Sequence, residues 1–280
     1  MAVLVFGGSS QIGHFLLPRL LAEGHDVLAV SRAPRALPTG VQWVVGQLPA
    51  PLPSTWPPFS AVISYGPLLP FARWLAQVPL EGAPHVVATS SMSAQSKQDS
   101  QVPAERAVAR TLLEGERALS EACVRRGLPL TILRPTLVYG AGLDRSLTPM
   151  ARRAMRLRVF PLPAGRGLRQ PVHADDLALA TIAALRPGHA GARVLQIGGG
   201  ERLTAAEMFA RVRASLPVAT VSVPLTGSLL RMGARWVPHL RGPLSRLERD
   251  LVADNGELTG QLGIVPRPFR PDAGCWTSVR

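Results

Sequence analysis

The chain has few of the residues on which several functional classes depend. Its two cysteines, Cys123 and Cys275, are too few and too far apart in the sequence for a disulfide framework or a metal site. No apolar run reaches the roughly 18 residues of a membrane-spanning helix. The first apolar run, Ala2 to Phe6, is too short for a signal-peptide core and follows no cationic segment. We therefore expect a cytoplasmic protein with no membrane span and no bound metal.

Lysine is almost absent as well. The net charge is +13, and Lys97 is the single lysine among 31 basic residues, so nearly all of the basicity is arginine. The arginines are spread along the chain, and no basic stretch alternates with aromatic residues as in sites for single-stranded nucleic acids. We therefore expect no nucleic-acid partner. The densest cluster has helical spacing and is interpreted as a solvated or anion-facing helix side: Arg152, Arg153, Arg156 and Arg158.

The chain does contain a regular alternation of short apolar runs and helical patterns. Seven runs rich in β-branched residues predict strands: VLVF, DVLAVS, QWVV, AVIS, HVVAT, LTIL and RVLQI. Continuous apolar runs of this length are typical of strands buried on both faces of a parallel sheet. Helical patterns at 11–23, 104–126 and 174–185 lie between several of these runs. This order predicts an α/β fold with a Rossmann-type, doubly wound parallel sheet.

The alternation changes after about residue 140. A helical pattern covers 147–158, a loop rich in proline and glycine is expected over 161–170, and a further helix over 204–216 begins with the capping-box pair Thr204 and Glu207. A smaller, irregular C-terminal substrate region is therefore expected beside the sheet.

The predicted domains interleave along the chain. A dinucleotide-binding domain is expected over 1–140, and 171–197 returns to complete its sheet. The substrate region then consists of 141–170 and 198–280. Because ligands of such sheets bind at the carboxyl ends of the strands, candidate site residues are sought there.

The segment VFGGSSQIG at 5–13 directly follows the first predicted strand and precedes the first predicted helix. Gly7, Ser10 and Gly13 have the spacing of a dinucleotide-binding glycine motif, with serine in place of the middle glycine. Gly7 permits a tight turn, and Gly13 lets the helix pack close to the sheet. Ser10 adds a small side chain whose hydroxyl can donate to phosphate, next to the amides and partial positive charge of the helix N-terminus. The loop therefore predicts a bound dinucleotide.

The end of the second strand distinguishes NADP(H) from NAD(H). A carboxylate there would bind the ribose 2′-hydroxyl, but the strand ends in Ser31 and Arg32, with Arg35 close behind. Asp26 stands at the opposite end of the strand. Because guanidinium groups suit a 2′-phosphate, we predict a preference for NADP(H) over NAD(H).

The chain resembles the extended or atypical short-chain dehydrogenases/reductases, specifically the NAD-dependent epimerase/dehydratase family. The matching segments occur in family order along essentially the whole chain: VFGGSSQIG, SYGP, VVATSSMS, LTILRPTLVYG, GRGLRQPVHADDLALA, LQIGGGERLTAAEMFARV and LGIVPRPF. The resemblance implies a Rossmann fold, a nicotinamide dinucleotide and an anionic substrate such as a nucleotide sugar.

The resemblance also implies roles for single residues. Arg169 takes the position that grips the substrate diphosphate in nucleotide-sugar members, whereas His173 and Asp176 fall in a segment that secures the sheet to the next helix. The residues implied to line the cofactor are Gly7, Ser9, Ser10, Gln11, Ile12 and Gly13 at the pyrophosphate, Gln47 at the adenine, Ser64, Tyr65 and Gly66 at the ribose, Thr89 at the end of the fifth strand, and Pro135 and Thr136 at the nicotinamide.

The Tyr-x-x-x-Lys pair of this family is missing. In the family, the tyrosine exchanges a proton with the substrate oxygen, and the lysine lowers the pKa of that tyrosine. Here the two tyrosines, Tyr65 and Tyr139, are followed four residues later by Leu69 and Leu143. Any acid/base chemistry therefore requires other residues.

Other side chains near the expected position supply candidates. By resemblance, Ser91 falls where the family serine binds the substrate oxygen, with Ser93 nearby. Lys97, the single side-chain amine, is a candidate proton shuttle, although it also fits a solvated loop lysine. Glu105 is a second candidate base. Arg106 and Arg110 stay protonated, so they can stabilise an oxyanion but cannot act as bases.

Two function classes remain open. One is an epimerase, dehydratase or reductase in which Ser91, Ser93 and Lys97 form a non-standard catalytic group. The other is a non-catalytic NADP(H)-binding sensor or interaction protein, as in some atypical members. Many family members pair through the helix that matches 104–126, so the resemblance implies a homodimer. Six charged residues on that helix leave this pairing open here: 105, 106, 110, 114, 116 and 117.

Overall fold

The computed structural model describes residues 1–36, 38–49, 57–186, 188, 192–225 and 247–277. The chain divides into two compact units, each built from three segments. Unit 1 comprises Met1–Pro135, Asp175–Ile197 and Asn255–Val265. Unit 2 comprises Thr136–Ala174, Gly198–Asp254 and Pro266–Arg280.

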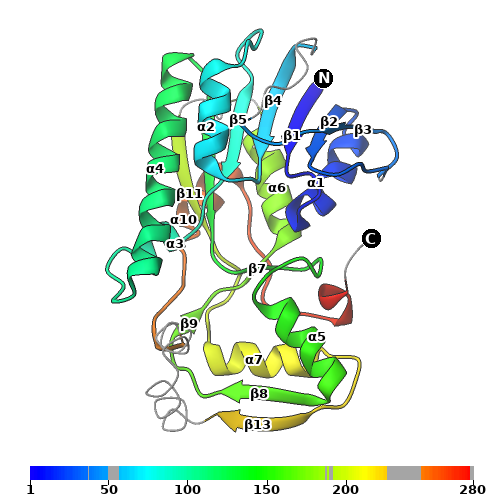
Figure 1. Ribbon diagram of the computed structural model, residues 1–280, viewed down its shortest axis with the longest axis vertical. Coiled ribbons are helices and arrows are strands. Elements are labelled where there is room, and N and C mark those ends of the chain that lie inside the picture. The colour runs from blue at the N-terminus through cyan, green and yellow to red at the C-terminus, as the bar shows by residue number, and fades with distance from the viewer. Residues whose placement is uncertain (37, 50–56, 187, 189–191, 226–246, 278–280) are drawn as a thin grey trace. The chain divides into compact units, whose positions relative to one another are not determined.

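A seven-stranded parallel sheet forms the centre of unit 1 (Figure 1). Its strands are β1 (Ala2–Phe6), β2 (Asp26–Ser31), β3 (Val41–Val45), β4 (Phe59–Ser64), β5 (His85–Thr89), β6 (Leu130–Pro135) and β11 (Ala192–Ile197). Their order is β11-β6-β5-β4-β1-β2-β3, so the strand order reverses between β1 and β4. All seven predicted strands are present, and the predicted doubly wound Rossmann-type fold is confirmed.

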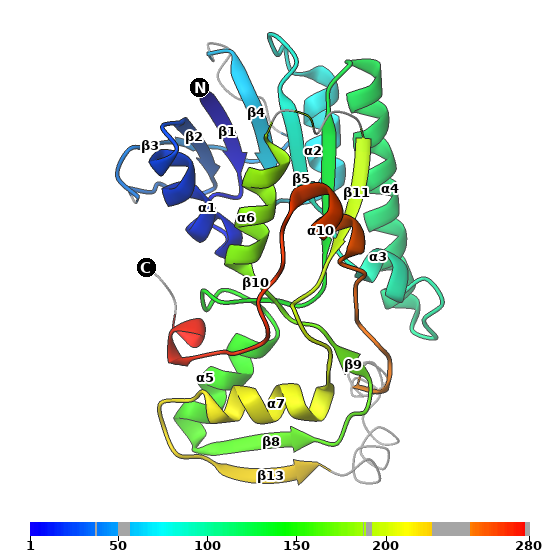
Figure 2. The ribbon, with the colours of Figure 1, turned by 180° about the vertical axis from the view of Figure 1, so that it is seen from behind.

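Helices cover both faces of this sheet, as the opposite views in Figures 1 and 2 show. The helices α2 (Leu68–Gln77) and α4 (Pro103–Arg125) lie on one face, and α1 (Gln11–Ala22) and α6 (Ala174–Ala184) lie on the other. The patterns at 11–23, 104–126 and 174–185 are thus confirmed as helices to within one residue. The helix α2 was not predicted, because its first turn contains Pro70 and is uniformly apolar, which hides the helical period.

A short helix, α10 (Gly256–Leu262), also belongs to unit 1, because it packs against β11. The sequence analysis assigned this part of the tail to the substrate region. Its apolar residues Leu258 and Leu262 are buried. The spacing of proline and glycine along the tail did not indicate that this segment packs against β11. No helix in the described ranges is long and apolar enough to cross a membrane.

Apolar side chains of β1, β4, β5 and β6 fill the layer between the sheet and the α2/α4 pair. Phe71 and Leu75 of α2 and Leu119 of α4 are fully buried in this cluster. Cys123 belongs to the same cluster, and burial raises the pKa of its thiol to about 12. Cys123 therefore serves packing rather than chemistry, as the absence of a cysteine motif predicted.

The contact between α2 and α4 depends on Gly115. A Cβ built at this position would lie 2.7 Å from Cβ of Leu68, which is closer than van der Waals contact permits. The missing side chain thus allows the two helices to approach each other closely.

Replacing Gly115 with alanine should destabilise the protein by about 1–3 kcal/mol, because the added methyl group would force the two helices apart. Urea unfolding would measure the change. The matched control is Gly260→Ala in α10, where the new Cβ would meet nothing within 4 Å and should leave stability unchanged or raise it by up to about 1 kcal/mol. Equal effects of the two substitutions would contradict a steric role for Gly115.

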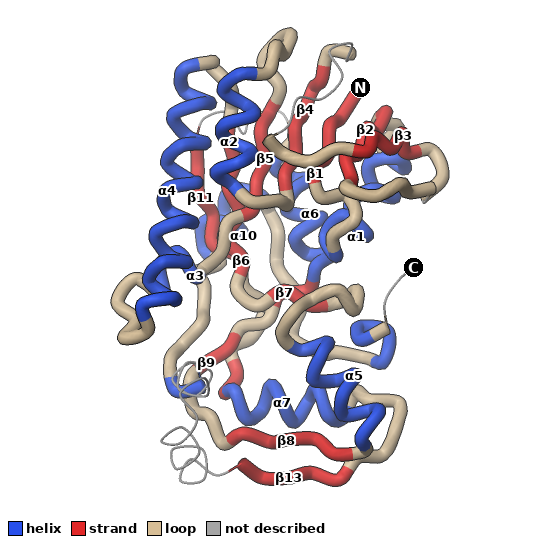
Figure 3. Tube along the Cα trace, in the orientation of Figure 1, coloured by secondary structure: helices blue, strands red, loops and turns tan. Residues whose placement is uncertain are grey.

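Unit 2 packs two helices against a ribbon of two strands (Figure 3). The helices are α5 (Leu147–Leu157) and α7 (Ala205–Ala214), and the ribbon pairs β8 (Val159–Pro163) with β13 (Val221–Leu225) in parallel. The smaller elements are β7 (Val138–Tyr139) paired with β10 (Val172–His173), β9 (Leu168–Arg169) paired with β12 (Leu203–Thr204), and the 3₁₀ turn η2 (Ala273–Trp276).

The expected loop over 161–170 is only partly correct, because β8 continues to Pro163 and β9 covers Leu168–Arg169. The capping box at the start of α7 is confirmed: the side chain of Thr204 accepts from the amide of Glu207, and the carboxylate of Glu207 accepts from the amide of Thr204. The core of this unit is aromatic and fully buried: Tyr139, Phe160, Phe269 and Trp276.

The C-terminus of α5 has an unusual cap. Arg158 occupies the left-handed region with φ 58°, as the single non-glycine residue at positive φ in the described part of the chain. Glycine is the usual residue at such a cap, because it has no Cβ to clash with the following carbonyl. Arg158 therefore holds this position against the intrinsic preference of its backbone.

Candidate functional site

The loop after β1 forms a tight turn into α1. Gly7 has φ 78°, and its carbonyl accepts from the amide of Ser10 at 2.9 Å. Ser10 is the N-cap of α1, and its Oγ accepts from the amide of Gly13 at 3.2 Å. The hydroxyl that replaces the middle glycine is thus used to fix the first turn, and its own proton remains a donor.

Gly13 is the residue of this turn at which a side chain would clash most severely. A Cβ at Gly13 would lie 2.2 Å from the carbonyl oxygen of Gly8. Gly8, which the sequence analysis left out, is restricted in turn: its Cβ would meet Ala29, Leu17 and Trp43 at 3.2–3.3 Å. The two glycines therefore let the turn pack closely against the sheet and the start of α1, beside helix amides that lie outside the helical hydrogen-bond pattern. This arrangement fits the pyrophosphate of a dinucleotide.

The carboxyl end of β2 is cationic, as predicted. Arg32 and Arg35 are exposed just beyond Ser31, whose Oγ accepts from the amide of Ala33 at 3.4 Å. Asp26 lies at the other end of the strand, 3.9 Å from the N-terminal amine. Gln47, the predicted adenine contact, is exposed after β3.

Tyr65 supports the loop rather than supplying a proton. Its Cβ lies 3.2 Å from the Cβ position of Gly7, and its hydroxyl donates to Oγ1 of Thr181 on α6 at 2.9 Å. Burial raises the pKa of Tyr65 well above its usual value, and the hydrogen bond with Thr181 opposes this only in part. Before it, Ser64 is fully buried, and its Oγ accepts from the amide of Gly66 at 3.4 Å.

The candidate catalytic serines follow β5 directly. Thr89 is the last residue of β5, and the pairing with β6 continues past it, since the amide of Met92 donates to the carbonyl of Pro135 at 2.9 Å. Ser91 is half-buried, and its Oγ accepts from the amide of Ser93 at 3.1 Å. With one lone pair used in this way, the hydroxyl proton of Ser91 is directed elsewhere as a donor.

The other two candidates lie beyond a single helical turn, α3 (Ser93–Ser96). Lys97 caps α3 and is half-buried, and its carbonyl accepts from the amide of Ser100 at 3.3 Å. The hydroxyl of Ser100 donates to the buried carboxylate of Glu105 at 2.6 Å. Arg106 donates to the carbonyl of Ser100 at 2.6 Å. Glu105 and Arg106 thus brace the segment that carries Lys97.

A buried charged cluster lies behind Ser91. Arg134 of β6 forms a two-pronged ion pair with Glu116 of α4, with Nε 2.8 Å from Oε1, and both side chains are largely buried. Ser90, the neighbour of Ser91, donates its hydroxyl to the same carboxylate. The cluster ties α4 to the ends of β5 and β6. From the sequence, Glu116 is one of six charged residues on the predicted helix, and its burial is not apparent because it depends on a partner 18 residues away.

Breaking this pair from one side should be costly. Glu116→Leu leaves the guanidinium of Arg134 buried without its carboxylate, so we expect a loss of about 3–5 kcal/mol in the free energy of unfolding. Glu116→Leu/Arg134→Met removes both charges and should recover at least about 2 kcal/mol of that loss. Chemical denaturation of the two variants measures the difference. Additive losses would show that the two residues do not interact.

Arg169, the predicted diphosphate ligand, is buried in unit 2. Its Nη1 donates to the carbonyls of Leu168 at 2.7 Å and Arg249 at 2.6 Å. Burial lowers the pKa of this guanidinium, and the carboxylate of Asp250 partly opposes that shift. Nη1 therefore serves the backbone, and any contact with a substrate would use other donors of the guanidinium.

The neighbouring Gln170 holds unit 2 together. Its amide group donates to the carbonyl of Gly199 and accepts from the amide of Ala253, both at 2.8 Å. Its own carbonyl accepts from the hydroxyl of Thr136. Thr136 was predicted beside the nicotinamide, and its side chain is buried in this contact. Pro135, the other residue predicted there, ends β6 and is buried.

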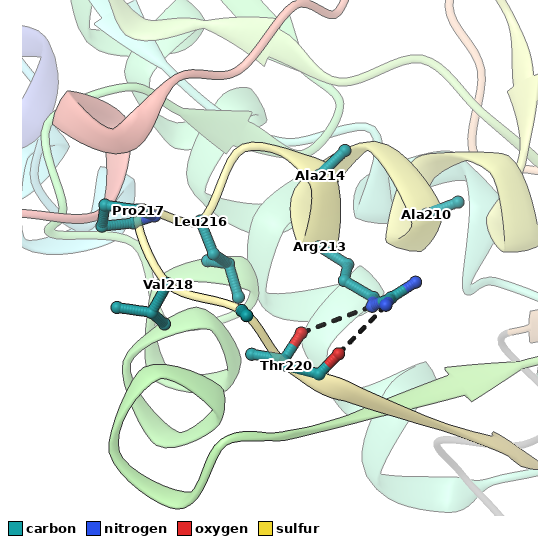
Figure 4. A pocket seen from close by; sticks show the side chains of 8 residues that line it. Ala210, Arg213, Ala214, Leu216, Pro217, Val218 and Thr220 are labelled. Carbon is teal, nitrogen blue, oxygen red and sulfur yellow. Dashed lines mark hydrogen bonds between the residues drawn. The ribbon is translucent and has the colours of Figure 1, made fainter.

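Unit 2 contains two pockets at the end of α7. One of about 600 Å³ is lined by Arg213, Leu216 and Thr220 among others, and Arg213 donates to both oxygens of Thr220 (Figure 4). A second, of about 430 Å³, contains the ion pair between Arg211 and Glu201. None of the predicted site residues lines either pocket. The described residues contain no cluster of metal-ligating side chains.

Comparison with known families adds to this geometry. Residues 81–198, from β5 to β11, match the model of the NAD dependent epimerase/dehydratase family. The predicted resemblance to this family is confirmed. The matched range includes the candidate serines, the buried cluster around Glu116, and Arg169. No curated protein sequence matches the chain.

Several solved structures resemble the protein in fold over nearly the whole chain. MoeE5 in complex with UDP-glucuronic acid and NAD has a TM-score of 0.73 and 22% identity, covering 98% of this chain and 97% of its own. A UDP-glucuronic acid 4-epimerase from Bacillus cereus, with UDP-glucuronic acid and NAD, has a TM-score of 0.71, 17% identity, and 95% and 94% coverage. A UDP-glucose 4-epimerase from Thermotoga maritima has 0.68, 16%, and 99% and 96%. At these identities the likeness shows the fold.

Proposed function

We propose that the protein is a nicotinamide-dinucleotide enzyme of the epimerase/dehydratase type that prefers NADP(H) and acts on a nucleotide sugar or a similar anionic substrate. The observation that carries the proposal is the tight turn between β1 and α1, in which Gly13 packs against the carbonyl of Gly8 and Ser10 caps the first turn of the helix, whose free amides suit a pyrophosphate. The solved structures of similar fold support it, since their titles name NAD and UDP-sugars.

The residues of the loop would hold the cofactor by charge and by shape. The first turn of α1 would direct amides and a partial positive charge at the phosphates, while Gly7 and Gly13 permit the tight turn and Ser10 caps the helix. Arg32 and Arg35 supply the positive charge expected for a 2′-phosphate. The bound nicotinamide would supply hydride transfer.

The preference for NADPH can be measured directly. Arg32→Ala/Arg35→Ala should weaken NADPH binding about tenfold or more, because each guanidinium lost removes a charged hydrogen bond, and should leave NADH binding unchanged. Calorimetric titration with both coenzymes gives the two affinities. Asp26→Ala at the opposite end of β2 serves as the control and should change neither. An equal loss for NADPH and NADH would contradict recognition of the 2′-phosphate.

At the reacting centre, Ser91 would act as a hydrogen-bond donor to the substrate oxygen. Its Oγ already accepts from the amide of Ser93, which leaves the proton for the substrate. Lys97 is the candidate to exchange the proton, because Tyr65 is buried against Thr181 and Tyr139 is fully buried in the aromatic core of unit 2. By the family resemblance, Arg169 would bind the substrate diphosphate.

Turnover with a panel of UDP-sugars and NADP⁺ or NADPH tests this chemistry. Ser91→Ala should lower kcat by about 100-fold, the usual cost of one donor to a developing oxyanion. The control is Ser96→Ala on the exposed side of α3, which should be silent. Product analysis and absorbance at the nicotinamide band report the reaction. Unchanged kcat in Ser91→Ala would contradict its role.

One observation favours a second candidate, a non-catalytic NADP(H)-dependent sensor or interaction protein. Unit 1 contains one tyrosine, Tyr65, and its hydroxyl is fixed structurally rather than directed at a substrate. Tight NADPH binding without turnover of any sugar nucleotide, together with cofactor-dependent capture of a partner, would favour this candidate over the enzyme.

A further inference from the structure

Exposed large apolar side chains gather at one place in unit 2. Ten such side chains occur in the described ranges, and most of them are scattered singly. Four of the ten lie together at the end of α5 and on the β8/β13 ribbon: Leu157, Val159, Val221 and Val223. Their exposed fractions run from 41% to 67%, so a concentration of this kind calls for a partner.

Strand register explains why the valines share a face. Val159 of β8 pairs with Val221 of β13, and Pro161 pairs with Val223, so their side chains point to the same side of the ribbon. The residue between them, Phe160, points to the opposite side and is fully buried in the core with α5 and α7. In a sheet with one face in solvent, the residues that point to the solvent are ordinarily polar, whereas on this face they are valines and a proline.

The same region is strongly cationic. Arg153, Arg156 and Arg158 are exposed and form no ion pair with any residue that the structure describes. The chain has no aspartate or glutamate over 147–163 or over 208–225. Arg152 differs from its neighbours, since its guanidinium donates to the carbonyls of Trp276 and Gly142. The predicted anion-facing helix side therefore consists of three arginines rather than four.

Arg158 is the most informative of the three. It stands in the left-handed cap position where glycine would be favoured, directly before Val159, and its carbonyl accepts from the amide of Val221 at 2.8 Å. It therefore joins the arginines to the first pair of valines. A cation kept where the backbone prefers glycine suggests a role outside the fold itself.

We propose that this surface, the ribbon face (Arg153, Arg156, Leu157, Arg158, Val159, Val221 and Val223), docks on a bilayer that contains anionic phospholipid. Guanidinium groups beside aliphatic side chains match lipid phosphates above acyl chains. A second copy of the chain is disfavoured as the occupant, because a two-fold contact would bring like-charged arginines together. A nucleic acid is disfavoured too, because it would leave the valines facing phosphates.

Co-sedimentation of the full chain with lipid vesicles tests the proposal. The protein should pellet with vesicles of equal parts phosphatidylcholine and phosphatidylglycerol at low ionic strength, and not with phosphatidylcholine alone. Added salt should weaken binding, because the surface potential falls off within a Debye length. Val221→Asp/Val223→Asp should reduce partitioning about tenfold or more, since it places carboxylates in the apolar row.

Two matched controls separate docking from folding. Val124→Asp alters a single exposed valine on α4, in unit 1, and should leave partitioning unchanged. Arg158→Gly relieves the strain of a non-glycine residue in the left-handed region, so it should raise Tm. It also removes one cation, so it should lower partitioning about fivefold, the usual effect of one arginine near an anionic surface. Arg125→Ala removes an exposed arginine of α4 and should have no effect.

Three outcomes would overturn the proposal. The first is failure of the wild-type protein to pellet with the anionic vesicles. The second is equal partitioning of the wild type, Val221→Asp/Val223→Asp and Arg158→Gly. The third is a dimer in analytical ultracentrifugation that Val221→Asp/Val223→Asp dissociates, which would make the ribbon face an interface between copies. None of these results depends on cofactor or substrate, so the proposed enzymatic function is tested separately.

Discussion

The candidate site depends on one close backbone approach. Because Gly13 has no Cβ, the first turn of α1 packs against the carbonyl of Gly8, and Gly8 in turn packs against β2 and β3 side chains. Ser10 then caps the helix through its own side chain. These contacts place the helix N-terminus at the carboxyl end of β1, next to the point where the strand order reverses. The position of any bound dinucleotide follows from this geometry.

In place of the Tyr-x-x-x-Lys pair, the region around Ser91 contains buried polar contacts that fix the loop after β5. Glu116 and Arg134 join α4 to β6, and Ser90 joins the same carboxylate to the end of β5. Ser100 and Glu105 brace the segment after α3. The loop that carries Ser91 and Lys97 is therefore held on both sides. What this geometry supplies most clearly is a hydrogen-bond donor at Ser91, which suits chemistry that stabilises an oxyanion.

The arginine content of the chain divides into distinct roles. Some guanidinium groups serve the interior: Arg152 and Arg169 donate to backbone carbonyls, and Arg134 pairs with Glu116. Others remain at the surface with no carboxylate beside them, as on the ribbon face. Composition alone treats all of these as one net charge of +13 and does not separate the two roles.

The sequence by itself determined the seven strands, five of the helices, the capping box of α7 and the turn at Gly7, because each is encoded by local periodicity or by the conformational limits of single residues. Tertiary structure decided the burial of Glu116, the fixing of Tyr65 by Thr181, the assignment of α10 to unit 1 and the pairing of β8 with β13. Each of these joins residues far apart in the chain. Their partners are selected by packing and by the desolvation of charges, which no local window of sequence records.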